Sequence, residues 1–131
     1  MRITRALYDQ MVSHARAEAP NECCGMVASR DGEAVKVLPA HNAEASALRF
    51  SIDPGEQLRL HDEIEDAGLD LGAIYHSHTR TAPKPSQTDI TFARGWPGVL
   101  WIIVGLTGPE PEVRTWMIHD GEVAEADLEV R

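Results

Sequence analysis

One short stretch of the chain carries most of the side chains that can bind a metal ion or move a proton. It contains Tyr75-His76-Ser77-His78, followed by Ser86 and Asp89. Side chains alternate between the two faces of a β-strand, so His76 and His78 should point to the same side. Two imidazole nitrogens and the Asp89 carboxylate form a ligand set suited to Zn²⁺, with the fourth tetrahedral position left for water. The pattern therefore predicts one zinc ion per chain, with a bound water, at His76, His78 and Asp89.

A water molecule in that position needs a base that lies near the metal without ligating it. Glu22 is the leading candidate, because it follows Pro20-Asn21 at the entrance to the apolar segment Cys23-Cys24-Gly25. Ser86 is a candidate for a second role, since its hydroxyl could donate a hydrogen bond to the oxyanion of a tetrahedral intermediate. Glu22 and Ser86 are thus the predicted catalytic residues.

Three segments have the patterns of helices. Residues Thr4 to Ala19 repeat apolar side chains at helical spacing behind a Thr4 cap. Asp53-Pro54-Gly55-Glu56 places a cap residue, a proline at the first helical position and a glutamate three residues after the cap, which predicts a helix to about Ala67. Ser86-Gln87-Thr88-Asp89 is the expected start of a short third helix, which would present Asp89 from its first turn.

The strands are predicted between these helices and after them. Asp31-Gly32 and Asp120-Gly121 are dipeptides favoured in two-residue hairpin turns. Val99 to Val104 is apolar on both faces, as expected of a buried central strand. The remaining expected strands are Cys23–Ser29, Glu33–Leu38, Leu69–His78, Glu112–His119 and Glu122–Val130. We expect an α/β fold, with residues 1–131 forming a single domain in which helices flank a mixed sheet.

Composition narrows the class of protein further. The chain has 131 residues, 12 Lys and Arg against 21 Asp and Glu, and a formal net charge of −9. This balance argues against a nucleic-acid partner, because such binding depends on cations that neutralise phosphates. The N-terminus lacks a signal-peptide pattern and the longest apolar run is far too short for a membrane span, so we expect a cytoplasmic protein with no membrane partner. Adjacent Cys23 and Cys24 give no disulfide framework and are interpreted as small buried apolar residues.

Each of these signals has a plainer interpretation when it is taken alone. A His-x-His pair on a strand is often structural, and Ser86 with Asp89 is also the pattern of a helix capping box. His61-Asp62-Glu63 imitates the His-x-Glu of zinc deaminases, but no Pro-Cys-x-x-Cys follows it. No function is assigned to His14, His41 or His119, while Trp96, Trp101 and Trp116 are expected either in the core or in the wall of a groove.

Glu22, His76-Ser77-His78, a gap of seven residues, Ser86, two residues and Asp89 together resemble the JAMM (MPN-plus) metalloprotease motif, E…H-x-H-x₇-S-x-x-D. All five defined positions and both internal spacings match. The resemblance implies that His76, His78 and Asp89 ligate zinc, that Glu22 activates water and that Ser86 supports the oxyanion. It also implies a curved mixed sheet flanked by helices, related to the cytidine deaminase fold.

The similarity extends over most of the chain to the bacterial Mec-like sulfur-carrier-protein–cysteine hydrolases. The matching segments are His14-Ala15-Arg16, Pro20 to Gly25, Asn42-Ala43-Glu44, Gly55 to Leu58, Tyr75 to Thr79 and Pro85 to Asp89. This resemblance implies a partner, a ubiquitin-like sulfur-carrier protein with a Gly-Gly C-terminus, from which cysteine is released.

Alternatives within and outside this chemistry stay open. Many deubiquitinating members carry Pro after the His-x-His pair, where this chain has Thr79, and 131 residues leave little room for the insertions that grip a second ubiquitin. Both features favour the sulfur-carrier role over polyubiquitin cleavage. A protease that trims a sulfur-carrier precursor to expose Gly-Gly, a general deubiquitinase-like isopeptidase and a non-catalytic MPN scaffold are the other hypotheses. The sequence predicts neither the oligomeric state nor what gates the zinc site.

Overall fold

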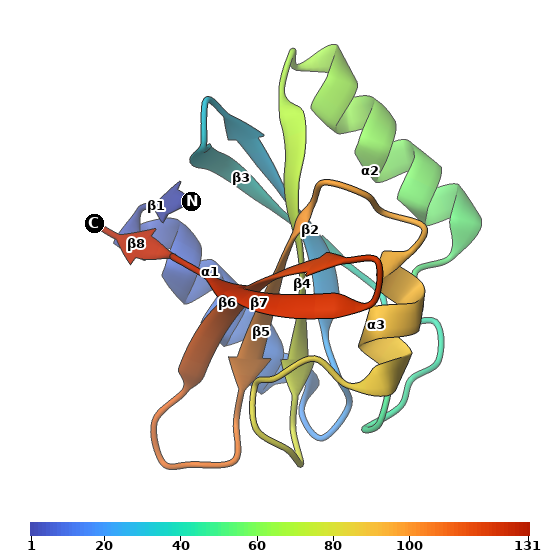
Figure 1. Cartoon of the computed structure of the whole chain (residues 1–131), viewed down its shortest axis with the longest axis vertical. Helices are drawn as coiled ribbons and strands as arrows, with labels where there is room; N and C mark the ends of the chain where they lie inside the picture. The colour runs from blue at the N-terminus through green and yellow to red at the C-terminus, as the bar shows by residue number, and fades with distance from the viewer.

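A computed structural model describes residues 1–131 as one eight-stranded mixed sheet with three helices (Figure 1). The helices are α1 (Arg5–Glu18), α2 (Pro54–Asp66) and α3 (Gln87–Ala93). The strands are β1 (Arg2–Ile3), β2 (Cys24–Arg30), β3 (Glu33–Ala40), β4 (Asp70–His78), β5 (Leu100–Gly105), β6 (Glu112–His119), β7 (Glu122–Ala126) and β8 (Glu129–Val130). The predicted α/β class and mixed sheet are confirmed.

The sheet has the order β7-β6-β5-β4-β2-β3-β1-β8, and its two edge strands, β7 and β8, follow one another in the chain. The sheet must therefore curl until its edges approach each other, as Figure 1 shows. The two termini lie together at this point, where the N-terminal ammonium donates to the Asp127 carbonyl at 3.0 Å and the Glu129 amide donates to the Met1 carbonyl at 2.9 Å. The central pair β4 and β5 is parallel, and its other neighbours are antiparallel.

The prediction of one strand from Glu122 to Val130 was wrong. β7 ends at Ala126, and Glu129–Val130 pairs in parallel with β1 at the opposite edge of the sheet. Strand β1 itself was not predicted. Two-residue strands carry no alternation that a sequence pattern could reveal, so their pairing depends on how the rest of the sheet curls.

Both predicted hairpin turns are confirmed. Asp31 and Gly32 have φ of 51° and 78°, and Asp120 and Gly121 have φ of 51° and 79°. Positive φ at both central residues is what a type I′ turn requires, and Asp-Gly adopts it at low cost. These turns join β2 to β3 and β6 to β7.

The predicted helix starts are confirmed, with one difference in detail. Thr4 Oγ1 accepts from the Leu7 amide at 3.3 Å, and Asp53 Oδ2 accepts from Gly55 and Glu56 amides at 3.1 and 3.3 Å. Glu56 does not complete a capping box, because its carboxylate accepts a hydrogen bond from the His41 amide at 2.7 Å. Glu56 thereby connects α2 to the loop that follows β3.

The helices lie on both faces of the sheet and bury two apolar clusters. α1 covers one face, against a cluster that includes Val27, Ala73 and Tyr75, while α2 and α3 cover the other face, against a cluster that includes Met26 and Ile74. Residues of β4 alternate between these clusters, as the period of a strand requires. His76 and His78 therefore face the side on which α3 lies.

Other predictions about buried residues also have clear outcomes. Cys23 and Cys24 are free and buried, as predicted. Trp101 and Trp116 belong to the core, whereas Trp96 is partly buried and lines a groove beside α2. None of the three helices is long and apolar enough to span a membrane.

Candidate metal centre

The candidate site lies at the end of the sheet where β4 finishes. His76 and His78 are in its last three residues, and the loops that follow β3, β4 and β5 gather at this end, at the bottom of Figure 1. His76 is fully buried and His78 is nearly so. A buried strand with a helix to one side thus fixes both imidazoles on one face.

Asp89 reaches the same point from α3. Ser86 is the N-cap of this helix: its hydroxyl accepts from the Asp89 amide at 3.1 Å, and its own amide donates to Asp89 Oδ2 at 2.9 Å. This reciprocal pair is a capping box, which fixes both the start of the helix and the direction of the carboxylate. Asp89 is only 4% exposed.

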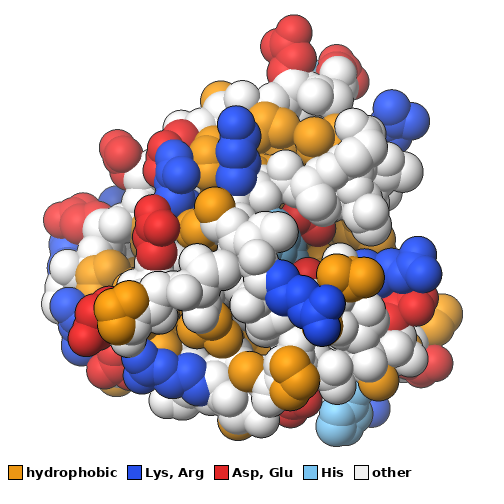
Figure 2. Space-filling model, turned by 90° about the horizontal axis from the view of Figure 1, so that it is seen from below, with side chains coloured by type: hydrophobic (Ala, Val, Ile, Leu, Met, Phe, Trp, Pro, Cys, Tyr) orange, Lys and Arg blue, Asp and Glu red, His pale blue; other side chains and the backbone are white.

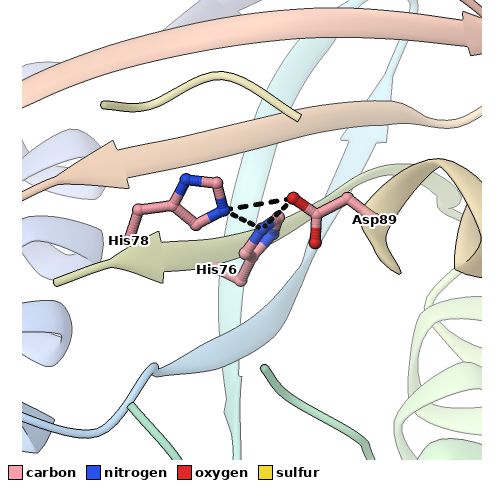
Figure 3. A group of neighbouring side chains, drawn as sticks. All are labelled: His76, His78 and Asp89. Carbon is pink, nitrogen blue, oxygen red and sulfur yellow. Dashed lines mark hydrogen bonds and ion pairs between the residues drawn. The ribbon is translucent and has the colours of Figure 1, made fainter. Parts of the chain in front are cut away.

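The three predicted ligand side chains point toward one another (Figure 3). His76 Nε2 lies 3.2 Å from His78 Nε2 and 3.2 Å from Asp89 Oδ2, and His78 Nε2 lies 3.1 Å from the same oxygen. The three atoms form a nearly equilateral triangle in the protein interior. The structure thus brings together the residues that the sequence had singled out.

Two contacts fix the orientation of the imidazoles. His78 Nδ1 lies 2.9 Å from the Ala82 carbonyl, so we assign the proton of neutral His78 to Nδ1, which leaves a lone pair on Nε2. Phe50 stacks on His76 with ring centroids 4.6 Å apart. The loop after β4 and the loop before α2 therefore both support the site.

The surroundings of Asp89 favour its ionised form. Burial raises the pKa of Asp89, but His76, His78 and the Ser86 amide outweigh it and hold the pKa well below its usual range. Burial likewise lowers the pKa of His78, but the hydrogen bond to Asp89, the Ala82 carbonyl and the charges of Asp89 and Glu22 outweigh it and raise the pKa. Asp89 is therefore ionised across the physiological pH range.

The donor set fits zinc. Zinc takes imidazole nitrogen and carboxylate oxygen at about 2.0–2.2 Å in tetrahedral geometry, which places ligand atoms roughly 3.3 Å apart. The separations of 3.1–3.2 Å match that edge length. Three lone-pair donors face one point, which is unfavourable unless a cation or proton lies between them. With three protein ligands, a fourth position is left open, as in catalytic zinc sites.

Glu22 and Ser86 line the same cleft as His78. This cleft has a volume of about 110 Å³, and its other lining residues are Ala47, Leu48, Thr79, Arg80 and Thr81. Figure 2 views the molecule from the loop end and shows acidic and His side chains in a hollow, with Lys or Arg side chains on its border. The two largest grooves of the molecule lie along α2, away from these residues.

Glu22 has the environment of a proton acceptor rather than that of a structural carboxylate. It is 5% exposed, and its Oε1 atom is buried without a hydrogen-bond partner. Burial raises the pKa of Glu22 to about 7; the charge of His78 lowers it and that of Asp89 adds to the rise. A buried carboxyl that titrates near neutrality and opens on a cleft is a candidate general base.

Other residues of the site were not predicted from the sequence. They include Phe50, the Ala82 carbonyl and Asn42, whose side-chain amide donates to the Glu22 carbonyl at 3.1 Å. A backbone carbonyl carries no sequence signal, and Phe50 lies in a segment without periodicity. Asn42 stands in one of the segments that resemble the family and is a residue type that caps turns, but its partner could not be predicted.

Comparison with protein families gives an independent result. Residues 4–119 match a model described as prokaryotic homologs of the JAB domain. The chain belongs to this family. The JAB domain here includes β4, α3 and the whole His-His-Asp cluster.

Curated relatives of this JAB domain include proteins named as a peptidase, a protease and a desampylase. The CysO-cysteine peptidase of Mycobacterium tuberculosis is 38% identical over 127 residues, which cover 95% of this chain and 86% of that protein. A probable TtuB-protein conjugate cleaving protease of Thermus thermophilus is 36% identical, covering 92% and 77%. A desampylase of Haloferax volcanii is 37% identical, covering 76% of each chain.

Solved structures support the same fold. Protein DSY2949 from Desulfitobacterium hafniense has a TM-score of 0.89 at 30% identity, covering 99% of this JAB domain and 92% of that chain. The JAB1/MPN domain protein AF2198 from Archaeoglobus fulgidus has a TM-score of 0.67 at 22% identity, covering 99% and 98%. At the lower identity the likeness shows the fold alone, which agrees with the curved mixed sheet that the motif implied.

Proposed function

We propose that this JAB domain is a zinc-dependent peptidase that cleaves after the C-terminal glycine of a ubiquitin-like sulfur-carrier protein and releases cysteine. The observation that carries the proposal is the triangle of His76, His78 and Asp89, at 3.1–3.2 Å, beside a cleft that Glu22 and Ser86 line. The relative named CysO-cysteine peptidase supports the substrate class.

His76, His78 and Asp89 would hold one zinc ion. When bound, zinc supplies Lewis-acid polarisation of the scissile carbonyl and lowers the pKa of a neighbouring water molecule. Glu22 accepts a proton from the attacking water, because it lines the cleft and its Oε1 atom has no hydrogen-bond partner. A pKa of about 7 suits that exchange at neutral pH.

Ser86 stabilises the negative charge that develops on the carbonyl oxygen. Its hydroxyl oxygen already accepts from the Asp89 amide, so its hydrogen is free to donate into the cleft. Such a donor acts on charge that appears only in the transition state, where it contributes most to the rate. The bond that forms joins the water oxygen to the carbonyl carbon.

Collapse of the tetrahedral species breaks the bond between that carbon and the amide nitrogen. Glu22 returns its proton to the leaving nitrogen, so the products are the carrier carboxylate and free cysteine. A cleft of about 110 Å³ accommodates little more than main chain near the reacting atoms, which fits a tail that ends in glycine. An extended Gly-Gly segment carries no side chains that would have to fit into this cleft.

Cleavage of protein conjugates is the second candidate function. The relatives named TtuB-protein conjugate cleaving protease and desampylase favour it, at 36% and 37% identity. In that reaction the leaving group is a lysine side chain of a second protein instead of free cysteine. The same triangle and the same base would perform both reactions, so the two functions differ in substrate and not in mechanism.

The test is to incubate purified protein with three substrates and weigh the products by mass spectrometry. These are a sulfur carrier ending in Gly-Gly-Cys, a carrier precursor with extra residues after Gly-Gly, and a carrier joined to lysine through an isopeptide bond. The proposal expects fastest release of cysteine from the first substrate and about one zinc per chain. Faster cleavage of the isopeptide would favour the second candidate, and cleavage of none by zinc-loaded protein would overturn both.

A further inference from the structure

Strand β4 uses its two faces for different purposes at the site. His76 and His78 face the side of α3, whereas Ser77 points to the opposite face of the strand. Thr79 is the first residue after β4. Both hydroxyl side chains bind the segment Pro20–Cys23, which carries Glu22. Neither hydroxyl residue is one of the five motif positions whose roles were predicted.

Ser77 holds the residue that follows Glu22. The Ser77 amide donates to the Cys23 carbonyl at 3.2 Å, and the Cys23 amide donates to Ser77 Oγ at 2.8 Å in the buried interior. In a regular antiparallel pair the second of these bonds would go to the backbone carbonyl. The Ser77 hydroxyl takes the place of that carbonyl, so the ladder of β2 with β4 ends one residue after Glu22.

Thr79 holds the other side of the same segment. Its hydroxyl donates to the Pro20 carbonyl at 2.9 Å and lies 3.5 Å from the Ala47 carbonyl. Pro20 stands two residues before Glu22, while Ala47 belongs to the loop that lines the cleft. Ser77, in β4, and Thr79, directly after it, thus bind both flanks of Glu22 to the end of the strand that supplies the imidazoles.

The position of the Glu22 carboxylate depends on the hydrogen bonds that its own backbone and its neighbours make. Its Oε1 atom has no hydrogen-bond partner, whereas its amide donates to the Ser46 carbonyl at 2.7 Å and its carbonyl accepts from Asn42 Nδ2. A side chain without partners is placed by its backbone and by the walls around it. Any shift of residues 20–23 therefore moves the carboxylate relative to the His-His-Asp triangle.

We propose that Ser77 and Thr79 are positioning residues for Glu22: side chains at the end of β4 and directly after it hold the metal ligands and the general base in fixed positions relative to one another. This inference rests on the proposed function only for the role of Glu22 as the base. A misplacement of about 1 Å in a reacting group is enough to lower a rate on the order of a hundredfold, so two hydroxyl contacts at the flanks can control turnover.

The decisive comparison is Thr79→Val with Thr79→Ser, in zinc-loaded protein acting on the Gly-Gly-Cys carrier. Valine keeps the shape of threonine and removes the hydroxyl, whereas serine keeps the hydroxyl. Thr79 is only half-buried, so neither variant should unfold the protein. We expect T79V to lower kcat about tenfold with unchanged KM and zinc content, and T79S to retain the kcat of the unmodified protein. Equal kcat for T79V and the unmodified protein would overturn the role of Thr79.

A double variant separates positioning from a general structural effect. If Thr79 acts through Glu22, adding T79V to Glu22→Gln should not reduce the residual rate further. A further tenfold loss in the double variant would contradict the proposal. Activity in E22Q equal to that of the unmodified protein would instead refute Glu22 as the base, and with it the proposed function.

Hydrogen exchange tests the contacts without any reaction. In metal-free protein, Ser77→Ala removes the acceptor of the Cys23 amide, so that amide should exchange at least tenfold faster while the amides of β5 keep their rates. S77A also leaves a buried donor unpaired, and global unfolding would accelerate β5 as well. T79V should accelerate exchange at residues 21–23 alone. Unchanged exchange there in T79V would show that the Thr79 contact does not hold the segment.

Discussion

Ser86 and Asp89 bind each other reciprocally, and the Asp89 oxygen that accepts the Ser86 amide at 2.9 Å is also the one that faces His76 and His78. The cap of α3 and the proposed metal ligand therefore share one atom. A local helix signal thus contributes directly to the geometry of the site. Such an arrangement links the stability of a seven-residue helix to the position of a ligand.

Removing the Ser86 hydroxyl should affect both stability and activity. Ser86→Ala loses the bond from the Asp89 amide, and loss of a serine N-cap costs about 1 kcal/mol in the free energy of unfolding. If Ser86 also donates to the oxyanion, kcat should fall on the order of a hundredfold. Urea denaturation and steady-state kinetics measure the two effects.

Ser86→Gly separates the two roles. Glycine at an N-cap costs only a few tenths of a kcal/mol, so S86G should be more stable than S86A. Both variants lack the hydroxyl and should lose equal activity. An S86G protein with the kcat of the unmodified chain would exclude Ser86 from transition-state stabilisation and leave it a capping residue.

Zinc should stabilise the protein through the triangle. A ligand that binds only the folded state at a hundred times its Kd contributes about 2.7 kcal/mol, or roughly 10 °C in Tm for a chain of this length. Replacing Asp89 by Ala should abolish most of that shift, because Asp89 Oδ2 completes the ligand set. Thermal unfolding with and without added zinc measures it.

The matched control is Glu22→Gln, which should keep the full zinc shift, since Glu22 lies outside the three-ligand cluster. Loss of the shift in E22Q would identify Glu22 as a ligand and contradict its assignment as a base. A D89A protein that zinc still stabilises by roughly 10 °C would place the metal elsewhere.

The elements that place the site could be predicted because their signals are local. Alternation put His76 and His78 on one face, and Ser86-x-x-Asp89 marked the helix that delivers the third side chain. The remaining contacts depend on tertiary structure. Ser77 could be expected to point away from the imidazoles, but only the pairing of β2 with β4 shows that it meets Cys23. The parallel pairing of β1 and β8 likewise follows from the curl of the whole sheet.

Cys23 and Cys24 should be unreactive in the native protein. Burial, the largest cause, raises the pKa of Cys23 to about 11 and that of Cys24 to about 12. Thiolate is the reactive form, so at pH 8 only about 0.1% or less of either thiol is available. Ellman's reagent should therefore detect almost no thiol within minutes, and two per chain after denaturation. Rapid native reaction of one equivalent would show that this segment opens, and a Cys23→Ala variant would assign it.

Replacing the proposed base should make the metal-free protein more stable at neutral pH. Burial raises the pKa of Glu22 from 4.5 to about 7, so the folded state binds this proton more tightly than the unfolded state does. Stability therefore falls as pH rises from about 4.5 to 7 and stays lower above that range.

The carboxamide that E22Q introduces cannot ionise, so this loss is absent in the variant. We expect E22Q to be about 2 kcal/mol more stable at pH 8, with a smaller difference at pH 5. Urea denaturation in the presence of a chelator at both pH values measures the gap. A difference in the free energy of unfolding that is zero, or that does not grow between pH 5 and pH 8, would mean that the ionised Glu22 carboxylate is not buried in the folded protein. The mechanism would then lack the buried, unpartnered acceptor on which it depends.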